Sequence, residues 1–243
     1  RIRQEYFFVS AGLQSILNHY LEKYDQPLTK LDQYVVVHIN DTHPSMAIAE
    51  LMRLLMDEHG LGWEDAWQVT VNVMSYTNHT IMAEAMERWD INMMQQEVPR
   101  ILQIIQESDR RFVLSLEGKY DQNFINRTRI IANNQVHMAH LAIIGSHSIN
   151  GVAKLHTELL KKEVLHDFYR LYPERFNNKT NGVTLRRWMA IDNPRLAAIL
   201  DQEIGSGWRK NPLELEKLLK YRSNNKVLDQ LIAAKQANKR DLT

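Results

Sequence analysis

Three strand-like runs in this chain end in clusters of polar and titratable side chains, and a helical pattern follows. Residues 34–39 are mostly apolar and β-branched, and they end in Asn40-Asp41-Thr42-His43-Pro44. Residues 72–76 lead in the same way into Thr77-Asn78-His79-Thr80, and residues 175–180 lead into Asn181-Gly182. Strands that alternate with helices favour a parallel α/β sheet, which binds ligands at the carboxyl ends of its strands. The Asn, His and Thr side chains at these ends therefore predict a site for a polyhydroxylated ligand.

Helical periodicity covers much of the remaining chain. Apolar residues recur at spacings of three and four, as on one face of a helix, in residues 6–20, 46–55, 63–71, 91–105, 137–144 and 153–164. Asp90 is expected to cap the helix over 91–105, and Pro99 to bend it. Residues 148–152 predict a short strand. The polar residues 117–134 lack periodicity and predict an irregular connection.

The two ends of the chain lie inside helical patterns. Arg1 opens an amphipathic run, and Thr243 follows a helical pattern that has no Gly or Pro stop. Before it, Asn211-Pro212-Leu213-Glu214 combines an N-cap, a proline in the first turn and a glutamate placed to complete a capping box. We expect the 243 residues to be part of a longer protein.

The amino-acid composition argues against several classes of function. The chain has 30 Lys and Arg against 29 Asp and Glu, so its net charge of +1 gives no electrostatic case for nucleic acid or an acidic membrane surface. No apolar run reaches the roughly 18 residues of a membrane helix, and no signal peptide is visible. The absence of cysteine excludes disulfides and thiolate chemistry and fits a reducing compartment. We expect a cytoplasmic protein that binds neither nucleic acid nor membranes.

A metal-dependent hydrolase is one alternative function, because His38, Asp41 and His43 lie close together in sequence. Alternation of side chains along a strand places residues 38 and 43 on opposite sides, and the chain has no His-Glu-x-x-His motif. A non-catalytic helical interaction module is a second alternative. His137 and His140 are three apart on a predicted helix and could share one face of it. A role as buried, hydrogen-bonded histidines fits them better than a role as metal ligands.

Acid–base catalysis by a carboxylate pair is a further possibility for Asp41 and Glu84. Two carboxyl groups at a fixed separation perform the acid and base steps of glycoside hydrolysis. Each carboxylate taken alone fits a helix-terminus or ion-pairing role better.

Six motifs, in order along the chain, resemble those of one enzyme family. They are Gln4-Glu5-Tyr6-Phe7-Phe8-Val9-Ser10, Asn40-Asp41-Thr42-His43-Pro44, Tyr76-Thr77-Asn78-His79-Thr80, Glu84-Ala85-Met86-Glu87-Arg88-Trp89, Met138-Ala139-His140-Leu141 and Asn178-Lys179-Thr180-Asn181-Gly182. The chain is similar in these motifs to the α-glucan phosphorylases, the family of the glycogen, starch and maltodextrin phosphorylases. The resemblance runs across essentially all 243 residues.

The resemblance implies a fold and a domain organisation. Members of this family have two Rossmann-like domains that face each other across a catalytic cleft, the GT-B glycosyltransferase fold. The chain is then a helix-rich α/β part of that fold. Residues 1–182 would form the later half of the N-terminal domain, and residues 183–243 the truncated start of the C-terminal, cofactor-binding domain.

The resemblance also implies an activity and its partners. The family transfers the terminal α-1,4-linked glucosyl unit of a glucan to inorganic phosphate, with retention of configuration, and releases glucose 1-phosphate. Its cofactor is pyridoxal 5'-phosphate, bound as a Schiff base by a lysine that lies downstream of this chain. The resemblance implies a homodimeric parent and an isolated fragment without activity.

Site residues follow from the same resemblance. His79 would bind the 6-hydroxyl of the glucosyl unit, with its main-chain carbonyl facing the charge that develops at the anomeric carbon, and Asn181 would bind sugar hydroxyls. These two are the catalytic candidates. The substrate-binding candidates are Asp41, Thr42 and His43 beside the glucose, Thr80 after His79, and Glu84 and Arg1 in a neighbouring pocket.

Overall fold

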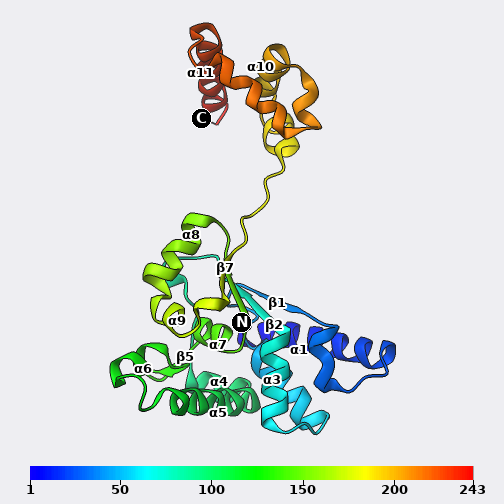
Figure 1. Ribbon diagram of the computed structural model, residues 1–243, viewed down its shortest axis with the longest axis vertical. Coiled ribbons are helices and arrows are strands. Elements are labelled where there is room, and N and C mark those ends of the chain that lie inside the picture. Colours follow the sequence, from blue (N-terminus) through cyan, green and yellow to red (C-terminus); the bar gives the residue numbers. More distant parts are fainter. Residues whose placement is uncertain (243) are drawn as a thin grey trace. The chain divides into compact units, whose positions relative to one another are not determined.

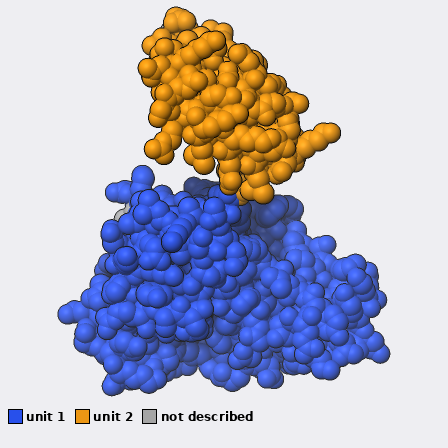
Figure 2. All heavy atoms as spheres, turned by 45° about the horizontal axis from the view of Figure 1, so that its top comes forward, with its two compact units in different colours: residues 1–181 blue, residues 182–243 orange. Residues whose placement is uncertain are grey.

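The computed structural model describes residues 1–242, which divide into two compact units (Figure 2). The first unit is Arg1–Asn181, and the second begins at Gly182. Each unit has its own hydrophobic core.

A four-stranded parallel sheet organises the first unit (Figure 1). Its strands are β1 (Val37–Asn40), β2 (Met74–Thr77), β6 (Ser148–Gly151) and β7 (Phe176–Asn178), hydrogen-bonded in the order β1-β2-β6-β7. Parallel neighbours need a crossover connection, and helices lie between all four strands in the sequence. The expected helix-rich α/β class is confirmed, whereas a purely helical module is not what the chain forms.

The helices of the first unit cover this sheet and extend beyond it. In chain order they are α1 (Ile2–Lys23), α2 (Ala47–Arg53), α3 (Trp63–Val73), α4 (Ile91–Glu97), α5 (Pro99–Leu116), α6 (Gln122–Thr128), α7 (Met138–Ile144), α8 (Lys154–Leu159) and α9 (His166–Leu171). A second, antiparallel sheet has the order β3-β5-β4, with β3 at Arg88–Asp90, β4 at Ile131–Ala132 and β5 at Gln135–His137.

The inner strands are the most buried part of the parallel sheet. All four residues of β2 are buried, and Ile39, Tyr76 and Ile149 lie side by side in the registered strands with almost no exposed surface. A strand covered by helices on both faces can bury every side chain, which explains this pattern. The sheet therefore gives a rigid base to the loops that follow its strands.

A buried carboxylate joins the first two helices of this unit. Glu50 of α2 has no exposed surface, and it accepts hydrogen bonds from the Tyr6 hydroxyl at 3.0 Å and the Ser10 hydroxyl at 2.7 Å, both on α1. Arg53 adds two bonds of 2.8 Å to the same carboxylate. A buried charge is costly unless it is paired and hydrogen-bonded, as Glu50 is. This network fixes α1 against the helix that follows β1.

Several predicted element boundaries are wrong. The strand predicted over 34–39 begins only at Val37, because the Tyr34 and Val35 amides close a turn on the Leu31 carbonyl. The strand predicted over 72–76 begins at Met74, since α3 continues to Val73. Pro99 does not bend one long helix: α4 ends at Glu97, and Pro99 occupies the first turn of α5, where its missing N–H has no cost.

The irregular connection predicted over 117–134 is also only partly correct. It contains α6, which Asp121 caps by accepting a hydrogen bond from the Phe124 amide at 2.9 Å. The buried Asp109 then accepts bonds from the Ile130 amide at 2.7 Å and the Ile131 amide at 3.1 Å. A tertiary contact of this kind, invisible to local periodicity, orders the segment that becomes β4.

The second unit is helical within its described residues. It contains α10 (Pro194–Ile204), α11 (Asn225–Arg240) and shorter turns, packed around Ala197, Leu200, Ile204 and Trp208. Asn211 starts a helix as predicted, accepting a bond from the Leu213 amide at 3.2 Å, but that helix, Pro212–Tyr221, is a 3-10 helix. Glu214 does not complete a capping box and pairs with Lys217 at 2.8 Å.

Candidate functional site

The carboxyl ends of all four parallel strands meet at one edge of the sheet, and that edge is polar. Asn40 is paired in register with Thr77, Thr77 with Asn150, and Gly151 with Asn178. Parallel strands place their carboxyl ends together, so side chains from four distant segments become neighbours. This edge holds the loops that the sequence predicted as a site.

A hydrogen-bonded chain of side chains runs across the edge. The Thr77 hydroxyl donates to Asn150 Oδ1 at 2.7 Å and accepts a bond from His38 Nε2. Thr77 and Asn150 are buried, so their bonds are made away from solvent. Burial lowers the pKa of His38, and the nearby His79 lowers it further. His38 is therefore neutral near pH 7 and acts as a donor to the edge.

His79 lies in the loop after β2. Its Nε2 donates to Asn40 Oδ1 at 2.5 Å, and in the tautomer with the proton on Nε2 the other ring nitrogen, Nδ1, is an acceptor. The ring is exposed. A histidine held by one ring nitrogen, with the other open to solvent, is suited to bind a hydroxyl group.

The residue before His79 fixes the loop. Asn78 has no exposed surface, and its amide N–H donates to the Asn150 carbonyl at 2.9 Å. Its side chain accepts a bond from the Thr80 amide at 3.0 Å and donates to the Tyr76 hydroxyl at 3.1 Å. Asn78 is therefore tied to the sheet and Thr80 is tied to Asn78, so the main chain is held on both sides of His79.

Asp41 and Thr42 form the loop after β1. Asp41 has φ of 69°, in the left-handed region, and its amide donates to the Thr77 carbonyl at 3.0 Å. Its carboxylate accepts a bond from the Thr42 amide at 2.6 Å. Asp and Asn tolerate this backbone conformation better than other residues with a side chain. Thr42 is buried, and its hydroxyl has no hydrogen-bond partner among the described residues.

Asn181 lies on the segment that follows β7. Its amide donates to the Val152 carbonyl at 3.0 Å, and its side chain is exposed and makes no hydrogen bond within the described part of the chain. Strand β6 lies between the strands that lead to His79 and Asn181. The structure thus places both catalytic candidates after strands of one sheet edge, with free side-chain hydrogen-bonding capacity.

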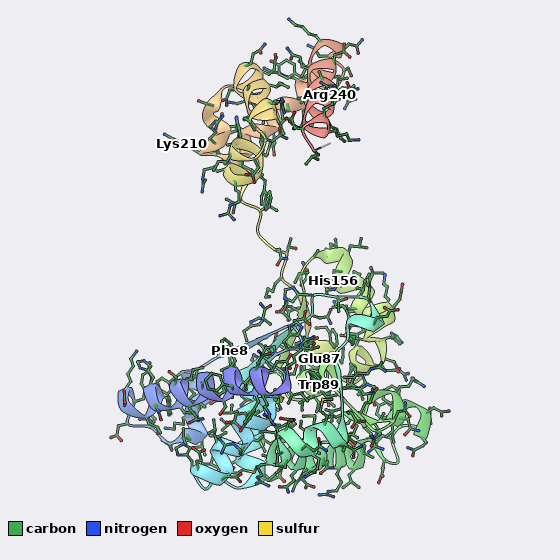
Figure 3. All side chains as sticks on the ribbon, turned by 180° about the vertical axis from the view of Figure 1, so that it is seen from behind. Phe8, Glu87, Trp89, His156, Lys210 and Arg240 are labelled. Carbon is green, nitrogen blue, oxygen red and sulfur yellow. The ribbon has the colours of Figure 1, made fainter. Side chains whose placement is uncertain are left out.

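Three more of the predicted residues lie in a separate pocket of about 590 Å³. Arg1, His43 and Glu84 line it, together with Glu87 and Trp89, which Figure 3 labels. Arg1 pairs with Glu5 at 2.9 Å and with Glu87 at 3.1 Å. Burial raises the pKa of Glu87, and the neighbouring Glu5 raises it further, while Arg1 and His43 oppose this.

Sequence reasoning missed Glu87 and the buried Asn150. Glu87 stands in the same motif as Glu84, but only Glu84 was assigned to the pocket. Asn150 lies within the strand predicted over 148–152, near its carboxyl end, and that position is a usable signal.

The histidine cluster proposed for metal is not assembled. His38 contacts Thr77, whereas His43 lines the pocket beside Arg1. Within residues 1–242, no group of three or more His, Asp or Glu side chains could hold a metal ion. His140 is a partly buried histidine with a hydrogen-bond partner: its Nδ1 is 2.8 Å from the Arg129 carbonyl, and desolvation lowers its pKa to about 4.

Among residues 1–242, none of the helices combines the length and the apolar character that a membrane-spanning segment needs.

Comparison with known proteins identifies the family. All of residues 1–243 match the family described as carbohydrate phosphorylase. The chain is 45% identical over its whole length to glycogen phosphorylase of Bacillus subtilis and covers 30% of that protein. It is 47% identical, again over its whole length, to maltodextrin phosphorylase of Streptococcus pneumoniae, of which it covers 31%.

An animal enzyme matches over nearly the same region. Glycogen phosphorylase, muscle form, of Oryctolagus cuniculus is 42% identical over 98% of the chain, which covers 30% of that enzyme. The chain thus spans about 30% of the length of these relatives. The match over every residue shows that this chain belongs to the carbohydrate phosphorylase family.

Proposed function

We propose that this chain is part of an enzyme that transfers the terminal α-1,4-linked glucosyl unit of a glucan to inorganic phosphate. The observation that carries the proposal is the family match over all 243 residues, to proteins named as glycogen and maltodextrin phosphorylases. The polar sheet edge supports it, because it presents hydroxyl-binding groups at the end of a parallel sheet.

The reaction breaks the bond between the anomeric carbon and the glycosidic oxygen. A phosphate oxygen bonds to the anomeric carbon, the proton of the inorganic phosphate goes to the departing O4, and the product is α-glucose 1-phosphate. Positive charge develops at the anomeric carbon as the old bond breaks. Fixed dipoles aimed at that position lower the barrier because they need no reorganisation during the reaction.

His79 would supply one such dipole. Its flanking residues are tied to the sheet, so its main-chain carbonyl is held in one orientation. The free Nδ1 of its ring would accept a bond from a sugar hydroxyl. Asn181, whose side-chain amide both donates and accepts, would bind further hydroxyls. Asp41, Thr42 and Thr80 would shape the surroundings of the glucosyl unit.

The pocket lined by Arg1, His43 and Glu84 would adjoin the glucosyl site. Its Arg1 is paired with Glu5 and Glu87, so this guanidinium would not demand an anionic ligand.

Pyridoxal 5'-phosphate, which the family resemblance implies, does not fit the residues of this edge. A lysine that forms a Schiff base is usually desolvated so that its amine is neutral. Lys179 is exposed, and its side chain makes no hydrogen bond or ion pair within the described residues. The cofactor lysine would lie outside these 243 residues.

The remaining parts of the proposal concern the whole protein. Units Arg1–Asn181 and Gly182 onward would belong to the N-terminal and C-terminal domains of a GT-B fold. The parent would be a cytoplasmic homodimer.

Phosphorolysis by the full-length protein tests this function. Maltoheptaose and inorganic phosphate are incubated with the enzyme, and phosphorus and proton NMR follow the products. The expected product is α-glucose 1-phosphate, with maltohexaose formed in equal amount. Release of free glucose in place of the phosphate ester would contradict the proposal and indicate hydrolysis.

A further inference from the structure

A histidine outside the groups named above contacts the backbone that carries Asn181. His156 lies on α8, the helix that follows β6 (Figure 3). Its Nδ1 is 3.1 Å from the amide nitrogen of Val152. A backbone N–H is only a donor, so Nδ1 accepts, and the proton of the neutral ring lies on Nε2.

Val152 connects this histidine to the proposed site. While its N–H donates to His156, its carbonyl accepts the bond from the Asn181 amide at 3.0 Å. Val152 therefore donates one hydrogen bond through its N–H and accepts another through its carbonyl, so its backbone is held on both sides. Because a hydrogen bond at each end restrains its orientation, the position of His156 sets where the carbonyl that anchors Asn181 points.

Close packing around Gly151 also restrains the backbone next to Val152. A Cβ added to Gly151 would lie 2.5 Å from the Thr157 hydroxyl and 2.9 Å from His156 Nδ1, so only glycine fits here. The Thr157 hydroxyl also bonds to Asn178 Oδ1 at 3.1 Å, and the Lys179 amide donates to the Gly151 carbonyl at 3.1 Å. The start of α8 is thus joined to β7, and the segment after β7 is joined to the end of β6.

The second ring nitrogen of His156, Nε2, does not stabilise the fold through any hydrogen bond to the described residues. This atom is buried and has no hydrogen-bond partner there. An unpaired buried polar group is costly, and an apolar side chain would avoid that cost. The compensating gain we identify is the acceptor that Nδ1 presents to Val152.

We propose that His156 is a positioning residue for glucosyl transfer, which holds Asn181 in place through the backbone of Val152. The inference rests on the proposed function, since it assigns Asn181 to the binding of sugar hydroxyls. His156 acts through the backbone and touches no substrate group.

Steady-state kinetics of the full-length enzyme test this role. His156→Ala removes the acceptor, and we expect kcat and kcat/KM to fall together by roughly 10- to 100-fold, because small displacements of a reacting group have effects of this size. In His156→Asn the side-chain oxygen takes the place of Nδ1, and we expect turnover to recover to within about 3-fold of wild type. His166→Ala, which removes a ring 3.1 Å from the Lys161 carbonyl, is the matched control and should leave turnover unchanged.

A double mutant separates positioning from a general effect on folding. If His156 acts through Asn181, His156→Ala should add little to the loss already caused by Asn181→Ala. Hydrogen–deuterium exchange should also be faster at the Val152 and Asn181 amides of His156→Ala, whatever its activity. Additive losses, unchanged exchange, or normal kinetics of His156→Ala would each overturn the inference.

The kinetics distinguish a failure of the role proposed for Asn181 from a failure of the role proposed for His156. If Asn181→Ala loses turnover and His156→Ala does not, only the role of His156 is overturned. If Asn181→Ala keeps normal turnover, the role of Asn181 fails and the role of His156 fails with it.

Discussion

At the scale of single residues, the candidate site depends on side chains that hold the backbone. Asn78 illustrates this: it is fully buried, and it bonds to the sheet on one side and to the Thr80 amide on the other. Buried polar groups that are fully satisfied make a structure rigid, whereas one missing bond is costly. His79, the residue that would meet the substrate, owes its fixed position to this neighbour.

The buried carboxylate Glu87 gives a pH-dependent prediction at this scale. Its pKa is raised in the folded protein, so its contribution to stability is present at low pH and is lost as pH rises through and above the ordinary carboxyl pKa of about 4.3. Replacement by Gln removes the charge. We expect the thermal midpoint of Glu87→Gln, relative to wild type, to increase from pH 4 to pH 7.

Differential scanning calorimetry of the full-length protein at both pH values provides the measurement. Glu84→Gln is the control, because Glu84 is exposed in the same pocket. A difference between Glu87→Gln and wild type that does not change with pH would contradict the burial of a charged Glu87.

At the scale of elements, the packing of α2 against the end of α7 depends on a close approach at Gly145. A Cβ at this position would lie 2.5 Å from Ile48 Cγ2, and Ile48 of α2 is completely buried. We expect Gly145→Ala to lower the free energy of unfolding by about 1–3 kcal/mol, as overpacking of a core does. Gly12→Ala on α1, where the new methyl group meets nothing within 4 Å, should raise stability by up to about 1 kcal/mol.

Urea unfolding of the two glycine variants, followed by circular dichroism, compares them directly. Equal midpoints for Gly145→Ala and wild type would show that Ile48 can move away without cost.

Sequence patterns predicted the type of most elements but not their limits. The helix over 137–144 was predicted within one residue, because its apolar residues are nearly continuous. The limits of β1 were wrong because a turn on the Leu31 carbonyl extends to Val35. The cap at Asp121 was a visible helix signal within a segment predicted to be irregular. The pairing of Asp109 with the Ile130 amide was not predictable, since those residues meet only in the folded chain.

Some features of the candidate site were predictable from the sequence, and others were not. Polar residues at strand ends were read correctly from sequence, because parallel strands place them at one edge. The bond between His156 and Val152, and the burial of Glu87 beside Glu5, depend on tertiary packing. Neither could be derived from spacing along the chain.

At the scale of the whole molecule, the chain is expected to be inactive alone. The sheet edge has no lysine suited to a Schiff base. We expect incubation with pyridoxal 5'-phosphate, followed by borohydride reduction, to give no unique stoichiometric adduct in mass spectrometry. A single lysine modified in equimolar amount would contradict this.

The isolated chain is also expected to self-associate. Phe7 and Phe8 of α1 are each 76% exposed, and β1 and β7 are the outer strands of the sheet. Exposed apolar side chains and open strand edges recruit other chains. Light scattering at about 100 µM should show dimers or larger species, and Phe8→Ser should reduce their size. A monodisperse monomer would refute this expectation.

The central claim is that His79 and Asn181 bind the glucosyl unit more tightly in the transition state than in the ground state. Kinetics of His79→Ala and Asn181→Ala in the full-length enzyme, normalised to the folded fraction, test it most directly. We predict that kcat and kcat/KM fall together by about 10- to 1,000-fold, the effect of a lost hydrogen bond of roughly 1.5 to 4 kcal/mol, with little change in thermal midpoint. Lower stability with unchanged turnover per folded molecule would contradict the claim and assign both residues to the fold alone.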